Sequence, residues 1–230
     1  MSATDFIFGT VGSPISTPKK PGGSAGAVAH SADLGLNALE LGWVHSVRVK
    51  ETTCEKINTA AAEHRVTLSV HAPYFINLNA KDDEWPKSRK RLMDAAHYGN
   101  LAGATDIIFH PGSYFGSPAA DVLPLALQRL RACVQELRAA GNPVTLRPET
   151  MGKSAMLGSL DDTLQLAQEI PGVAPCIDIS HLHARPGDGS VNTYAEFDVV
   201  IKSIGAALGE QALRQLHIHI SGIDYGPKGE

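Results

Sequence analysis

Five apolar stretches of the chain each end in a residue that can bind a metal ion or transfer a proton. These five residues, and a histidine three positions after the fourth, are His71, His110, Glu149, Asp178, His181 and His219. Imidazoles and carboxylates are the ligands that zinc and similar divalent ions prefer. Six ligands exceed the three or four that one zinc ion takes, so they predict at least two ions. Glu149 could bridge two of them, and paired ions assist phosphoryl displacement.

The stretches that carry these residues recur at the spacing of a repeated strand–helix unit. The expected strands are Phe6–Gly9, Ala38–Leu41, Thr67–His71, Asp106–His110, Val144–Glu149, Pro175–Asp178 and Leu216–Ile220. The expected helices are Gly26–Gly35, Lys50–His64, Pro86–Gly103, Ala119–Ala140, Leu160–Ile170 and Tyr194–Leu208, with Ser159 as an N-cap. This alternation predicts an α/β fold with a parallel sheet covered by helices. Seven strands fit a doubly wound sheet or an eight-stranded barrel without its last unit, and in a barrel the strand ends surround one mouth.

Composition limits the class of protein. A chain of 230 residues with 43% hydrophobic and 19% charged residues can bury a large core, and we expect one domain over residues 1–230. No apolar run of membrane-spanning length and no N-terminal secretory signal is visible, so we expect a cytoplasmic protein without membrane contact. Three dispersed cysteines fit buried thiols in a reducing compartment. The net charge of −4 gives no general attraction to nucleic acid, so any such binding must be local.

Residues near the six candidate ligands have other expected roles. Tyr74 and Phe75 follow His71 at the mouth of the predicted barrel, where exposed aromatic side chains favour stacking, although loop packing explains them equally well. His217 shares a strand face with His219, and we expect it to pack behind the ligands. His183 lies in a segment rich in proline and glycine, and we expect a solvent-exposed turn there.

At these residues the sequence resembles the endonuclease IV family of apurinic/apyrimidinic (AP) endonucleases, over nearly the whole chain. The segments that carry the resemblance are HAPYFINL at 71–78, HPGSYFG at 110–116, LRPETMGK at 146–153, CIDISHLHAR at 176–185 and LHIHISGIDYGPKGE at 216–230. Five such segments in the order of the family make a specific match.

The resemblance implies a TIM (β/α)8 barrel and a zinc-dependent enzyme of base excision repair. Such an enzyme hydrolyses the DNA backbone 5′ to abasic sites, leaves a 3′-hydroxyl, and holds three metal ions through nine side chains. The six candidate ligands match six of those nine, with Glu149 as the catalytic carboxylate that bridges two ions. Tyr74 and Phe75 match residues that wedge into the duplex where the damaged nucleotide is flipped out. Double-stranded DNA with an abasic site is the expected partner, and we expect a monomer.

One departure from the family lies at the end of the sequence. The remaining ligands of the family, namely an acidic residue, a histidine and a final glutamate on strand eight, follow the segment that ends here at Glu230. The resemblance therefore predicts a barrel without its C-terminal βα unit and two or fewer tightly bound zinc ions.

Two other functions fit the same residues. A metal-dependent sugar isomerase or epimerase of the xylose-isomerase-like barrel group shares the fold and a His/Asp/Glu metal site, but has no use for an exposed Tyr-Phe pair. A metal-binding barrel without catalytic activity is the third interpretation. An incision assay on a duplex with one abasic site, with and without chelator, separates them.

Overall fold

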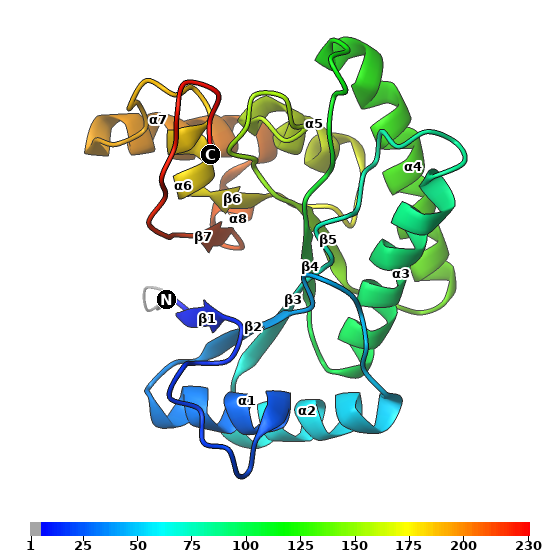
Figure 1. The fold of residues 1–230 in the computed structure, drawn as a ribbon, viewed down its shortest axis with the longest axis vertical. Helices are drawn as coiled ribbons and strands as arrows, with labels where there is room; N and C mark the ends of the chain where they lie inside the picture. Colours follow the sequence, from blue (N-terminus) through cyan, green and yellow to red (C-terminus); the bar gives the residue numbers. More distant parts are fainter. Residues whose placement is uncertain (1–5) are drawn as a thin grey trace. The chain divides into compact units, whose positions relative to one another are not determined.

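Strands and helices alternate along residues 6–230, which the computed structural model describes (Figure 1). The strands are β1 (Gly9–Val11), β2 (Ala38–Gly42), β3 (Thr67–His71), β4 (Asp106–Phe109), β5 (Thr145–Pro148), β6 (Cys176–Asp178) and β7 (His217–His219). The helices are α1 (Gly23–Asp33), α2 (Glu51–His64), α3 (Trp85–Leu101), α4 (Ala119–Ala139), α5 (Leu160–Glu169), α6 (Ile179–Ala184), α7 (Tyr194–Leu208) and α8 (Glu210–Leu213). The α/β class and the order of the elements are confirmed.

The described chain divides into two compact units, each built from three separate segments. The first unit comprises residues 6–74, 90–109 and 136–145, and the second comprises the remainder. No single cut in the chain separates the units. The single domain over 1–230 stays a prediction, and the predicted absence of a secretory signal concerns in part residues 1–5, which lie outside the described residues.

The first unit holds parallel strands that follow one another in sequence order. Strand β2 pairs with β1 and β3, and β3 pairs with β4. Helices α1 and α2 lie side by side along the sheet (Figure 1). Helix α2 buries Cys54, Ile57 and Ala61, which the helical period places on one face.

The second unit positions the ends of the last three strands. Strands β6 and β7 run parallel, with Cys176 opposite His217 and Asp178 opposite His219. Parallel bridges join the β5 segment to the chain around β6, including one between Glu149 and Cys176. Helices α5 and α7 contact each other over β6, where Leu164, Ile177, Leu182, Val200 and Ile204 form a buried cluster.

The N-cap at Ser159 is confirmed as part of a capping box. The Ser159 side chain accepts a hydrogen bond from the Asp162 amide, and the Asp162 carboxylate accepts one from the Ser159 amide at 2.8 Å. This box fixes the start of α5 directly after the loop that follows Glu149.

The first strand was predicted at the wrong residues. Pairing with β2 begins at Gly9 opposite Ala38, so the strand is Gly9–Val11 rather than Phe6–Gly9. Phe6 and Phe8 are exposed, and their apolar character therefore does not reflect burial in a sheet. The short helices α6 and α8 were absent from the sequence prediction, because pieces of six and four residues show too little periodicity.

Candidate metal centre

Glu149 is the centre of a group of imidazoles in the second unit. Its carboxylate oxygens lie 3.3 Å from His110 Nε2, 3.6 Å from His181 Nδ1 and 3.0 Å from His219 Nδ1. Only 1% of Glu149 is exposed, so its charge is held away from water. A buried carboxylate needs compensating groups, and three imidazoles within 3.6 Å of it supply them either as hydrogen-bond donors or as co-ligands of a cation.

Asp178 and His181 reach this group from the junction of β6 with α6. The Asp178 carboxylate caps α6 by accepting a 2.8 Å hydrogen bond from the His181 amide, and its other oxygen lies 3.6 Å from His181 Nδ1. Burial raises the pKa of the Asp178 carboxyl, although the neighbouring His181 acts in the opposite direction. Glu149, Asp178 and His181 each offer a ligand atom within 4.8 Å of the others.

The hydrogen bonds of His181 fix the orientation of its ring. The carbonyl of Thr150 can only accept, so the 2.8 Å contact with His181 Nδ1 places a proton on that nitrogen. His181 Nε2 then faces Glu230 Oε2 at 3.1 Å. A neutral imidazole would point a lone pair at a carboxylate there, and either a proton on Nε2 or a cation bound between the two atoms removes that conflict.

Glu230 is the site residue that the sequence-based prediction missed. The C-terminal segment folds back on the loop after β5, where Gly229 bridges to Lys153. Gly229 has a φ of +91°, and a Cβ there would lie 2.0 Å from the carbonyl oxygen of Gly152, so a side chain at this position would prevent the approach. The only signal in the sequence was that Glu230 ends one of the segments shared with the endonuclease IV family.

The remaining predicted residues lie at the end of β3. His71 and Tyr74 belong to the first unit, and Phe75 begins the first segment of the second unit. His71 is 4% exposed, and its Nδ1 lies 3.0 Å from the carbonyl of Ala72, which leaves Nε2 as the possible ligand atom. Tyr74 and Phe75 are 46% and 62% exposed, so neither belongs to the core.

Hydrogen bonds hold the loop that follows Glu149. Arg185, just after α6, donates to the carbonyls of Met151, Lys153 and Met156. The loop ends at Gly158, whose φ of +121° and 2.8 Å Cβ distance to the carbonyl oxygen of Glu149 leave room for no other residue. These contacts limit the movement of Glu149 and therefore keep the ligand geometry fixed.

Two histidines near the centre have other surroundings. The expectation of a solvent-exposed turn at His183 is wrong, because Asp178 caps α6 and carries the helix through His183. Its Nδ1 contacts the carbonyl of Ser190 at 2.6 Å, and its ring lies edge-on to Tyr225. His217 shares a strand face with His219, as the alternation predicted, and its ring centre is 5.2 Å from that of His219.

Comparisons with known proteins agree with this architecture. Residues 28–229 match the family described as xylose isomerase-like TIM barrel. The chain belongs to this family. The predicted barrel fold is thereby confirmed, and the described residues carry seven of its parallel strands.

Individual relatives in the xylose isomerase-like TIM barrel family include an uncharacterized protein of Methanocaldococcus jannaschii. It is 36% identical over 226 residues, which cover 98% of this chain and 80% of that protein. A probable endonuclease 4 of Staphylococcus saprophyticus is 27% identical over 188 residues, which cover 77% of this chain but only 60% of that protein. The resemblance to the endonuclease IV family is confirmed by this match.

Solved structures show the same fold. Endonuclease IV from Thermus thermophilus superposes with a TM-score of 0.69 at 22% identity, over 96% of this chain and 78% of that one. A D-psicose 3-epimerase superposes with a TM-score of 0.65 at 13% identity, over 89% of this chain and 81% of the epimerase. Both superpositions show that this chain has the fold of these two enzymes.

Two expectations from composition can be compared with the structure. Cys54, Cys133 and Cys176 are buried and form no disulfide, which confirms the prediction of buried thiols. Within residues 6–230, no helix is both long and apolar enough to cross a membrane.

Proposed function

We propose that this chain is a zinc-dependent AP endonuclease that hydrolyses the phosphodiester 5′ to abasic sites in double-stranded DNA and leaves a 3′-hydroxyl. The observation that carries the proposal is the environment of Glu149, a buried carboxylate within 3.6 Å of three imidazoles. The match to a probable endonuclease 4 supports the choice of substrate. Glu149 is the proposed catalytic residue.

The donor set in the second unit fits zinc. His110, Glu149, Asp178, His181 and His219 offer only the nitrogen and oxygen ligands that this ion accepts. The opposed His181 Nε2 and Glu230 Oε2 atoms are compatible with a shared cation. We propose His71 as a further ligand, because it ends β3 as Asp178 ends β6 and makes its backbone contact through Nδ1 rather than Nε2.

The residues of the chain contribute three things to the reaction. Bound zinc supplies Lewis acidity toward a phosphodiester and a means of activating water near neutral pH. Glu149 holds negative charge at the centre of the cluster and orients His110 and His219 through its two carboxylate oxygens. His181 is kept in one tautomer by Thr150, so its second ring nitrogen stays directed toward Glu230.

The exposed aromatic pair gives the DNA a contact that a sugar would not need. We propose that Tyr74 and Phe75 stack against bases where the abasic nucleotide leaves the duplex. Base stacking does not depend on net charge, so the charge of −4 does not oppose this contact, and the metal ions offset it locally at the phosphate.

An incision assay tests the proposal. The purified chain, loaded with zinc, is incubated with a labelled duplex that contains one abasic site and with the undamaged duplex. We expect cleavage 5′ to the abasic site alone, a 3′-hydroxyl product that a polymerase can extend, and loss of cleavage in chelator. Absence of cleavage together with epimerisation of a ketohexose would instead assign the chain to the sugar-epimerase activity of its structural neighbour.

A further inference from the structure

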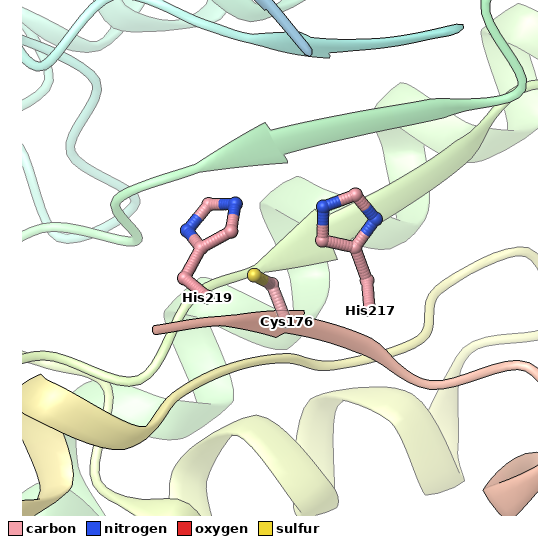
Figure 2. Close-up of side chains that lie close together, drawn as sticks. All are labelled: Cys176, His217 and His219. Carbon is pink, nitrogen blue, oxygen red and sulfur yellow. The ribbon is translucent and has the colours of Figure 1, made fainter. Parts of the chain in front are cut away.

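A second group of side chains of metal-binding types, Cys176, His217 and His219, shares His219 with the Glu149 centre. Figure 2 shows Cys176, His217 and His219 on one face of β6 and β7, with the sulfur of Cys176 between the two rings. The ligand atoms of the three residues all lie within 4.8 Å of one another. We propose that these residues form a separate site for a zinc-type divalent ion, which goes beyond the proposed nuclease function.

The strand register explains why the three side chains meet. Cys176 lies directly opposite His217, and the two-residue period of β7 puts His217 and His219 on the same face. Arg147 fixes this register, because its guanidinium donates to the carbonyls of Pro175 at 3.0 Å and Gln215 at 2.9 Å, just before the two strands. The ligand residues therefore stand on paired strands rather than on loops.

The donors suit a borderline ion. One thiolate and two imidazoles are a set that zinc and cobalt(II) accept, with metal–ligand distances of about 2.0–2.3 Å and donors therefore roughly 3.3–3.6 Å apart. The ligand atoms lie within 4.8 Å of one another, so the rings must rotate toward Cys176 for an ion to bind at these distances. Three protein ligands leave a fourth position for water or another group. Cys176 is fully buried, so its thiolate is stabilised only when a cation binds to it. Binding then releases the thiol proton to solvent.

His219 connects this site with the Glu149 centre. Its Nδ1 lies 3.0 Å from Glu149 Oε1, while the ring presents its other nitrogen toward His217 above Cys176 (Figure 2). If Nδ1 carries the ring proton and donates it to Glu149, the other nitrogen keeps the lone pair that an ion at the Cys176 site would bind. When that site is occupied, His219 therefore serves the Glu149 centre as a hydrogen-bond donor rather than as a ligand, because a neutral imidazole has only one lone pair.

Titration with cobalt(II) chloride under anaerobic conditions tests the site. A thiolate bound to cobalt(II) gives a charge-transfer absorption in the near ultraviolet that nitrogen and oxygen ligands do not give. We expect this band in the parent protein and in Cys133→Ala, which removes another fully buried thiol. Cys176→Ser should abolish the band. His217→Asn removes a ligand itself, so it should weaken cobalt(II) binding by at least about tenfold, which is the smallest loss seen when only the hydrogen-bonding partner of a ligand is removed.

Two further measurements keep the outcome unambiguous. His110→Gln should retain the band, because His110 is not one of the three proposed ligands and contacts Glu149 through Oε2, whereas His219 contacts Oε1. Loss of the band in this variant would make Cys176 a member of the Glu149 centre and overturn a separate site. X-ray absorption at the zinc edge of the loaded parent protein should show a sulfur neighbour at about 2.3 Å, and this measurement does not depend on a variant that folds.

The proposal is overturned if the parent shows neither the band nor the sulfur neighbour, or if the band survives in Cys176→Ser. It is equally overturned if binding is unchanged in His217→Asn. None of these readouts depends on DNA cleavage, so they stand apart from the nuclease proposal.

Discussion

Glu230 Oε2 lies 3.1 Å from His181 Nε2, and this contact joins the end of the sequence to α6. The His181 ring reaches Glu230 with one nitrogen because Thr150 holds the other. The contact places a carboxylate against the ring nitrogen of His181 that does not face Thr150.

Removing the Glu230 carboxylate should weaken this part of the centre. We expect Glu230→Gln to lower zinc affinity at His181 by at least about tenfold, because ligand partners contribute that much or more. Zinc per chain after dialysis against graded chelator concentrations measures the effect. Glu210→Gln, which changes an exposed acid on α8, is the control and should retain zinc as the parent does. Equal retention by the Glu230 variant would remove this residue from the centre.

Removing the Glu149 charge should nearly abolish cleavage of abasic DNA. In Glu149→Gln the proposed bridging carboxylate is lost while the shape of the side chain is kept, so circular dichroism should show an intact fold. Glu63→Gln on the exposed face of α2 is the matched control. An incision rate within about tenfold of the parent, some 1.4 kcal/mol of barrier, would contradict the catalytic role.

The aromatic pair should contribute to DNA affinity and not to metal content. We expect Tyr74→Ala and Phe75→Ala each to weaken binding to abasic duplex by about 1–3 kcal/mol, the contribution of one stacked base. Fluorescence anisotropy with abasic and intact duplexes measures this. Tyr194→Ala removes an aromatic side chain that is 87% exposed at the start of α7 and should change neither value. Unchanged affinity in the double variant would assign the pair to loop packing.

The number of tightly bound ions should be two or fewer. This number follows from the ligands that the chain supplies around Glu149, and it is measured in Cys176→Ser so that the additional site does not add to it. Mass spectrometry of the native protein gives the ions per chain. Three tightly bound ions in the 230-residue variant would show that other residues act as ligands.

Tyr114 should make stability depend on alkaline pH. Burial first, and then the hydrogen bond from its hydroxyl to Asp162, raise the pKa of Tyr114 to about 12. The folded protein therefore favours the protonated phenol, and its contribution is complete below the unfolded value of about 10 and is lost as the pH rises through about 12.

Comparison with Tyr114→Phe isolates this contribution. At neutral pH the variant should lose about 1.5–3 kcal/mol of unfolding free energy, as expected for a hydrogen bond to a carboxylate. Urea unfolding at about pH 8 and about pH 11 should show the difference between parent and variant becoming smaller at the higher pH. A difference that grows with pH would contradict the direction of the shift.

The sequence by itself determined which strand ends carry candidate ligands. Strand starts recur at the interval of a βα unit, and parallel strands end at the same edge, so this pattern alone places Glu149, Asp178 and His219 near one another. The same period put His217 and His219 on one strand face. The bridge between Glu149 and Cys176 and the register of β6 with β7 bear out that reasoning.

Only the tertiary structure decided the contacts that no period describes. Glu230 reaches His181 because the chain turns back at Gly229, and Cys176 meets His217 because Arg147 sets the register of two short strands. Likewise, Phe6 and Phe8 had the composition of a strand, but pairing with β2 begins only at Gly9. Local sequence encodes the period and the hydrophobicity of an element. Which residues meet across elements depends on strand register and on where the chain reverses its direction. Both are set by packing and by backbone hydrogen bonds between distant segments.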